Sequence, residues 1–241
     1  MNPGTITPQE ERGRKERSRR MLTWLMVIAI VMFFAGLTSA YVVSASGTYW
    51  VYFRIPGSFL LSTVAIVLSS IPAQLALVAA RQDRKGGVAP LLLLTLALGV
   101  VFTLYQFKGW GELVDRGNHL VGNLLHAKGT YGVDYTITKD GEELVLENGE
   151  FYRPSDGPTA RPLNAEMAEV QNTSSSYFYV LTWAHLAHLA FGLIALVVMV
   201  VQALRGRYNS TEHAGLWSGT VYWHFLGGLW IYLYLFLVYF H

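Results

Sequence analysis

The stretch "YFYVLTWAHLAHLAFGLIALVVMVV", residues 177–201, decides the fold class because it contains no Asp, Glu, Lys or Arg. A helix needs about 20 apolar residues to cross a hydrocarbon core of roughly 30 Å. Comparable runs extend from Leu22 to Val43, Gly57 to Ala80, Val88 to Phe107, Tyr177 to Leu204 and Trp217 to Phe240. An irregular backbone in lipid would leave its polar groups unpaired, so helix is the expected state. The sequence therefore predicts an all-α integral membrane protein, a bundle of five transmembrane helices.

Composition supports the membrane class and excludes several functions. Of the 241 residues, 52% are hydrophobic and 14% are charged. Cysteine is absent, which excludes a disulfide framework, a thiolate metal site and a catalytic cysteine. The net charge of +2 is an average over segments of opposite sign and indicates no nucleic-acid partner. The first apolar run is too long for the core of a signal peptide, so we expect no cleaved signal.

Lys and Arg are distributed unevenly between the two sets of connecting segments. The N-terminal arm and the links at 81–87 and 205–215 together hold eleven basic residues and five acidic ones. Segments 44–56 and 109–176 hold six basic and eleven acidic residues. By the positive-inside rule, the N-terminus is expected in the cytoplasm and the C-terminus outside.

The chain divides into four parts along this pattern. We expect a basic cytoplasmic arm at 1–21, transmembrane helices at 22–108, an outer insertion at 109–176 and two further transmembrane helices at 177–241. Within the insertion, "GELVDRGNHLVGNLLHA" at 111–127 is compatible with a short surface helix. Alternating residues around the turn signals Asp140-Gly141 and Asn148-Gly149 predict a small β-meander. Its acidic bias favours a docking surface for a partner protein.

Ionisable residues are almost absent from the predicted spans. None has Asp, Glu, Lys or Arg in its interior, which argues against an ion-driven transporter or a proton pump. His185 and His188 lie near one helical face and suit Zn, Cu or Fe, but a metal site needs further ligands. By helical rise, His224 falls at a different depth. Buried histidines that contact neighbouring helices, subunits or lipid headgroups are therefore the favoured interpretation.

Several motifs together resemble subunit III of the haem-copper respiratory oxidases. The pattern T-x-x-H-x-x-H-x-x-x-G is followed by H-x-G and by "YWHF" with a later Trp. The stretch "VMFFAGLTSAYVV" at 31–43 is similar to that family's "VMFFAGLFSAY", and residues 91–110 are similar to its "LLTxxLGxxFxxxQxxEW". The family usually has seven helices, and these five resemble its last five. The motif residues expected to make structural, lipid or subunit contacts are Thr182, His185, His188, Gly192, His213, Gly215, Tyr222, Trp223, His224 and Trp230.

Three positions depart from the family pattern. Ile30, Trp217 and Gly227 stand where the family commonly has a buried acid. Any role in this chain that depends on those carboxylates, including modulation of proton uptake, is in doubt.

The resemblance implies a non-catalytic subunit that binds no haem or copper itself. Such a subunit packs on subunit I, holds structural phospholipids and supports sustained turnover of a cytochrome c oxidase that reduces O2 and pumps protons. Subunits I and II, which carry haem and copper, are the implied partners. For the outer insertion, the implied partner is subunit II, a tethered cytochrome domain or a neighbouring complex. The implied location is a bacterial inner membrane. Open alternatives are the homologous subunit of a quinol oxidase or nitric oxide reductase system, an independent transporter, and a b-type cytochrome that uses the histidines as haem ligands.

Overall fold

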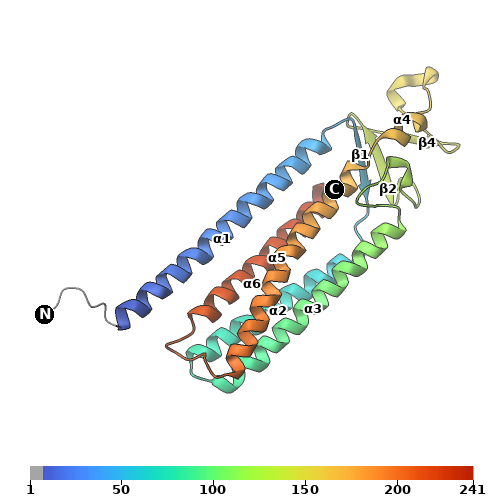
Figure 1. The fold of residues 1–241 in the computed structure, drawn as a ribbon. Helices are drawn as coiled ribbons and strands as arrows, with labels where there is room; N and C mark the ends of the chain where they lie inside the picture. Colours follow the sequence, from blue (N-terminus) through green and yellow to red (C-terminus); the bar gives the residue numbers. More distant parts are fainter. Residues whose placement is uncertain (1–7, 241) are drawn as a thin grey trace. The chain divides into compact units, whose positions relative to one another are not determined.

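The computed structural model describes residues 8–240. The first seven residues of the predicted arm and the terminal His241 lie outside the described residues. Five long helices dominate the chain (Figure 1): α1 Pro8–Ala45, α2 Gly57–Arg81, α3 Lys85–Asp115, α5 Thr173–Leu204 and α6 Ala214–Phe240. Each is long and apolar enough to cross a membrane, which confirms the predicted all-α membrane class with five candidate spans.

Helix α1 begins well before the first apolar run. It includes the described part of the basic arm, where Lys15 pairs with Glu11 at 2.7 Å and Arg20 pairs with Glu16 at 2.6 Å. Both pairs are spaced i,i+4, which stabilises an exposed helix by a few tenths of a kcal/mol per pair. The arm is therefore a helical extension of the first candidate span.

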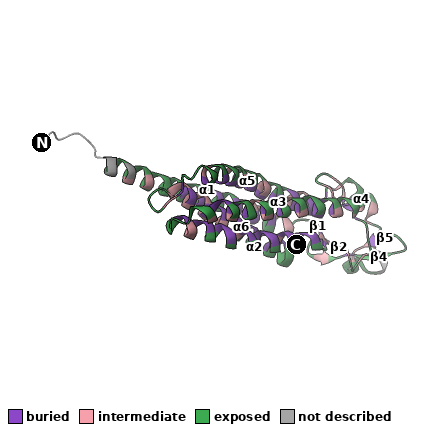
Figure 2. Ribbon diagram, turned by 90° about the horizontal axis from the view of Figure 1, so that it is seen from below, coloured by how far each residue is buried: buried purple, intermediate pink, exposed green. Residues whose placement is uncertain are grey.

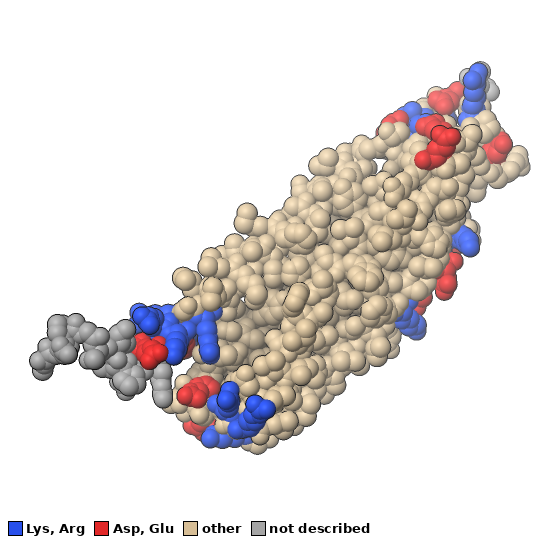
Figure 3. Space-filling view, viewed as in Figure 1, with Lys and Arg blue, Asp and Glu red and all other residues tan. Residues whose placement is uncertain are grey.

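The helix surfaces are apolar where a soluble protein would be polar. Only 28% of the most apolar window of α1, and the same share for α3, is buried within the chain. Green, exposed positions run along these helices in Figure 2, and Figure 3 shows a broad surface without Lys, Arg, Asp or Glu. Exposed Met32, Phe191 and Leu204 are typical of helices whose surroundings are lipid.

The β-structure contains the strands and turns of the predicted insertion and one further strand, β1. Strand β1 (Tyr49–Phe53) pairs antiparallel with β2 (Tyr135–Lys139), which also pairs with β3 (Glu142–Glu143). Strands β4 (Val145–Glu147) and β5 (Glu150–Tyr152) form a separate hairpin. Both expected turns are present, since Asp140, Gly141, Asn148 and Gly149 all have positive φ. The predicted small β-rich insertion is therefore confirmed, although Leu144 separates its middle strand into β3 and β4. The prediction did not include β1, because β1 comes from the short link after α1, more than 80 residues before β2.

Residues 111–127 do not form the separate surface helix that the sequence suggested. Helix α3 continues to Asp115, and only the 3-10 turn η1 (Leu124–His126) follows. Gly117 ends the helix with φ of +78°, and a Cβ there would overlap the carbonyl of His126. Further on lie η2 (Pro154–Thr159) and the short helix α4 (Asn164–Glu169).

The chain forms two compact units, each built from pieces of several helices. The first unit ends its N-terminal piece at Phe33 and adds Val64–Val101 and Ala187–Leu229. Its core includes Ile66, Leu92, Trp223 and Leu226. The second unit comprises Phe34–Thr63, Phe102–Leu186 and Trp230–His241, as far as these residues are described. Its fully buried side chains include Tyr41, Trp50, Phe59, Phe102, Phe178 and Trp230.

Candidate functional site

In the second unit, His185 and Trp230 lie together in the core. His185 is fully buried, and its ring lies 5.1 Å from the Trp230 ring and 5.9 Å from Phe102, centre to centre. The indole nitrogen Nε1 of Trp230 donates a hydrogen bond of 2.8 Å to Thr63 Oγ1 on α2. This cluster joins pieces of α2, α3, α5 and α6, so it fixes the packing of four helices within the unit.

Thr182, one turn before His185, bonds to α3. Its hydroxyl accepts a bond of 3.1 Å from Trp110 Nε1 and donates 2.9 Å to the Phe178 carbonyl. The Trp110 ring also stacks on Trp183 at 4.9 Å. Thr182 is 1% exposed, so this polar contact is sheltered from competing water.

In the first unit, Tyr222 and Trp223 make the main polar contacts of α6. The Tyr222 hydroxyl donates to the His188 carbonyl at 3.0 Å, and Trp223 Nε1 donates to Ser69 Oγ at 2.9 Å. The His188 ring itself lies 6.0 Å from Phe33. A Cβ on Gly192 would fall 2.9 Å from Leu226 Cδ1, so glycine at this position permits close packing of α5 and α6.

The remaining predicted histidines have separate partners. His224 Nε2 donates to Gln74 Oε1 at 3.2 Å, and His213 Nδ1 donates to the Asn209 carbonyl at 3.3 Å. Within residues 8–240, no three His, Asp or Glu side chains are grouped as a metal ion would require. The histidines are thus distributed among helix contacts rather than gathered into one centre.

Ile30, Trp217 and Gly227, where the resemblance leads us to expect an acid, have different surroundings. Ile30 is buried at 7% exposure. Trp217 receives the Arg20 guanidinium over its ring at 5.0 Å, a cation–π contact between α1 and α6. At Gly227, a Cβ would meet Ile66 Cγ1 and Ser70 Oγ at an ordinary 3.7 Å. Trp217 thus contacts a basic residue, Arg20, at a position where the resemblance leads us to expect an acid.

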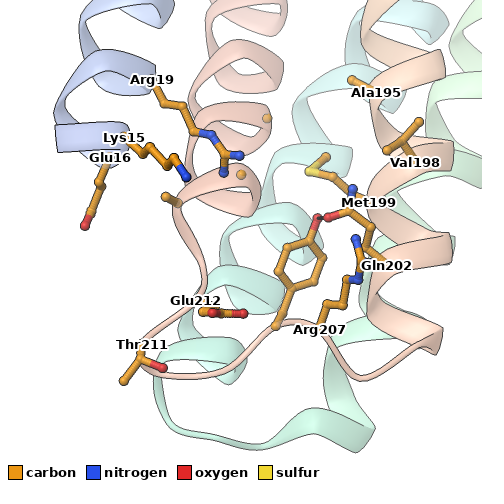
Figure 4. Close-up of a pocket in the computed structure, with 14 residues that line it drawn as sticks. Lys15, Glu16, Arg19, Ala195, Val198, Met199, Gln202, Arg207, Thr211 and Glu212 are labelled. Carbon is orange, nitrogen blue, oxygen red and sulfur yellow. Dashed lines mark hydrogen bonds between the residues drawn. The ribbon is translucent and has the colours of Figure 1, made fainter. Parts of the chain in front are cut away.

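A pocket of about 820 Å³ opens in the first unit between the charged N-terminal part of α1, the C-terminal part of α5, the link at 205–213 and the start of α6. Figure 4 shows Lys15 and Arg19 on one side and Met199, Gln202 and Arg207 on the other. Its apolar lining includes Ala195, Val198 and Met199. Gly215, a predicted site residue, also lines it, and a Cβ there would lie 4.0 Å from Arg19 Nη1. An apolar surface beside a charged lining in which basic residues outnumber acidic ones suits an anionic headgroup joined to a hydrocarbon chain.

Tyr208 closes one side of this pocket. The side chain is buried at 5% exposure, and its hydroxyl donates to Gln202 Oε1 at 3.1 Å. Burial raises the pKa of Tyr208 to about 12, while the nearby Arg19 charge lowers it by less. The phenol therefore stays neutral in the physiological range. The charged lining consists of three basic residues, Lys15, Arg19 and Arg207, and two acidic ones, Glu16 and Glu212.

Sequence reasoning missed the partners of these residues. It did not identify Thr63, Ser69, Gln74, Phe102 and Trp110 as contact residues, nor the pocket around Arg19 and Arg207. A polar residue recurs along α2 at Ser62, Ser69 and Gln74, and this stripe was the available signal. Basic residues near helix ends were used only to infer orientation.

Comparison with known proteins gives a consistent result. Residues 163–241 match the family model described as cytochrome c oxidase subunit III. Proteins named cytochrome c oxidase subunit 3 from Synechocystis sp. and Drosophila yakuba are 37% identical over 71 residues and 23% identical over 125 residues. The protein of that name from Corynebacterium diphtheriae is 22% identical over 213 residues, which cover 85% of this chain and 80% of the relative.

The extent of these matches is uneven. The matched segments cover 30% of the Synechocystis protein and 44% of the Drosophila yakuba protein, so the chain aligns with less than half of each. The family match covers α5 and α6, where the contacts of Thr182, His185, Trp223 and Trp230 lie. Over most of its length the chain resembles cytochrome c oxidase subunit III, with the match to the family model carried by residues 163–241.

Proposed function

We propose that this chain is the non-catalytic subunit III of a proton-pumping terminal oxidase that reduces O2 to water with electrons from cytochrome c. The observation that carries the proposal is the family match over α5 and α6, together with the Corynebacterium relative aligned over 85% of the chain. In this role the chain stabilises the catalytic subunit I, contacts subunit II and supports sustained turnover. Haem and copper belong to those partners.

The proposal places the chain in a bacterial cytoplasmic membrane. The unequal distribution of basic residues supports an N-terminus in the cytoplasm, a C-terminus outside and an insertion at 109–176 on the outer side. Within the spans, Thr182, His185, Tyr222, Trp223, His224 and Trp230 serve as helix contacts, and His188, Gly192 and Gly215 support them. His213 lies just before α6 and contacts Asn209 in the link. Their hydrogen bonds and ring contacts to neighbouring helices favour this structural role over metal ligation.

Copurification tests this function directly. The full chain carries an affinity tag and is extracted from its native membrane in mild detergent. We expect subunits that contain haem and copper to accompany it, with a reduced-minus-oxidised haem spectrum and O2 consumption driven by reduced cytochrome c. Oxygen consumption with quinol alone would assign the complex to the quinol oxidases. A colourless chain that arrives without partners would contradict the proposal, and a lone chain with a Soret band would reassign the histidines as haem ligands.

Lipid retention is the second part of the proposed role, and the pocket around Arg19 and Arg207 supports it. Arg19→Gln with Arg207→Gln removes two cations that can form charge-assisted bonds to a phosphate. We expect the anionic phospholipid retained by the purified complex at this site to fall at least about tenfold. Loss of a hydrogen bond to a charged group costs about 1.5 kcal/mol or more, and about 1.4 kcal/mol corresponds to a tenfold change in affinity. Mass spectrometry of lipids that remain bound after detergent washing measures this.

Arg205→Gln is the matched control for the lipid experiment. Arg205 lies in the same turn after α5 but does not line the pocket. Its replacement removes one positive charge and should leave lipid retention near the value of the unmodified complex. An equal loss in the control would indicate a general charge effect, and no loss in the double variant would exclude the pocket as a lipid site.

A further inference from the structure

We propose that the open edge of strand β4 binds an extended, basic segment of a partner protein as an added β-strand. This proposal rests on the function proposed above, because the partner is sought in the same complex, and it names which part of the insertion makes the contact. The hairpin β4–β5 belongs to the second unit and lies outside the five helices (Figure 1).

The two outer edges of this hairpin differ. On β5, the Phe151 N–H donates to Asn164 Oδ1 at 2.7 Å, and its carbonyl accepts from Leu163 N–H at 2.9 Å. The main-chain groups of Phe151 therefore point away from β4. Leu146 is paired directly with Phe151, so its N–H and carbonyl point away from β5 on the opposite side. Among residues 8–240, no strand pairs with β4 along that side.

The side chains of β4 are uncovered on both faces. Val145 is 41% exposed and Leu146 is 37% exposed, although neighbours in a strand point to opposite faces. Residues 145–150 are all exposed. Natural proteins usually protect such an edge with Lys, Pro or a covering segment, and β5 is covered by Leu163 and Asn164 at the start of α4. The edge of β4 is instead apolar and exposed, and an extended peptide can add to such an edge as a further strand.

The charge at the tip indicates which partner fits. Glu147 and Glu150 face each other across the hairpin, a like-charge pair that is unfavourable without a cation nearby. Nearby basic residues already have acidic partners. Arg153 contacts Glu142 at 2.8 Å and Asp140 at 3.4 Å, and Lys139 contacts Glu166 at 2.8 Å. A segment with Lys or Arg beside its apolar residues would complement both the acids and the open edge.

The experiment uses the whole complex in its native membrane. A photo-crosslinking amino acid replaces Val145, and crosslinked peptides are identified by mass spectrometry. We expect one recurrent partner peptide that contains Lys or Arg. Its yield should fall about tenfold in Leu146→Pro, which removes the outward N–H without breaking the ladder to β5. Yield should fall similarly in Glu147→Lys with Glu150→Lys, which leaves the backbone unchanged. Glu169→Lys, an exposed charge reversal elsewhere in the insertion, should have no effect.

The outcomes separate this proposal from the function proposed above. Crosslinks only to lipid, or a yield that neither the proline nor the charge-reversal variant changes, would overturn the strand-addition proposal while subunits I and II are still present. Absence of those subunits from the purified sample would instead contradict the proposed function. A partner peptide without Lys or Arg would exclude the basic segment.

Discussion

Replacing Trp230 with alanine is expected to destabilise the chain by about 3–5 kcal/mol, the usual cost of deleting a buried large aromatic side chain. Trp230 is 1% exposed and lies against His185, Phe102 and Phe59. The substitution leaves a cavity among these rings and removes the donor to Thr63 Oγ1. Unfolding of the purified chain in mixed micelles with increasing denaturing detergent measures the change in free energy.

Two further variants separate the causes of that effect. Trp24→Ala removes the same side chain from a position that is 54% exposed, and we expect a change below about 1 kcal/mol. Trp230→Phe keeps a ring but loses the bond to Thr63, and we expect about 1 kcal/mol. Equal stability losses in Trp230→Ala and Trp24→Ala would contradict the view that Trp230 anchors the second unit.

The long helices were predictable because their signal is local. A run without charged residues that is long enough to cross lipid leaves helix as the only favourable state, and the five runs lie within α1, α2, α3, α5 and α6. Helix ends were less predictable. Polar ends such as the start of α1 continue the helix through local ion pairs, which hydropathy does not detect. The sheet was harder still, since β1 pairs with β2 over more than 80 intervening residues.

For the candidate site, the sequence identified individual residues but not the residues that they contact. The resemblance identified Thr182, His185, Trp223 and Trp230 on α5 and α6. Their partners Trp110, Ser69 and Thr63 lie on α2 or α3. Contacts between helices depend on how each helix is rotated about its axis and on how closely two helices approach. Neither property follows from the hydrophobic pattern of a single segment. The pocket was missed for a similar reason, because Arg19 and Arg207 are far apart in the chain.

Gly99→Ala is expected to destabilise the first unit by about 1–3 kcal/mol, even though alanine favours helix over glycine. A Cβ at position 99 would fall 2.7 Å from Trp223 Cη2 and 2.9 Å from Leu193 Cδ2. The Trp223 ring is 1% exposed and is held by its bond to Ser69, so it cannot move aside without losing that bond. The same unfolding titration in mixed micelles measures the loss.

Gly36→Ala is the matched control, and it should change stability in the opposite direction. A Cβ at Gly36 has nothing within 4 Å, so only the gain in helix propensity, up to about 1 kcal/mol, remains. Trp223→Phe removes the ring atom that the new methyl group at position 99 would meet, and the double variant should therefore lose less than the sum of the two single variants. Strict additivity would show that the overlap with Trp223 does not cause the effect, and the glycine would then be explained by Leu193 alone.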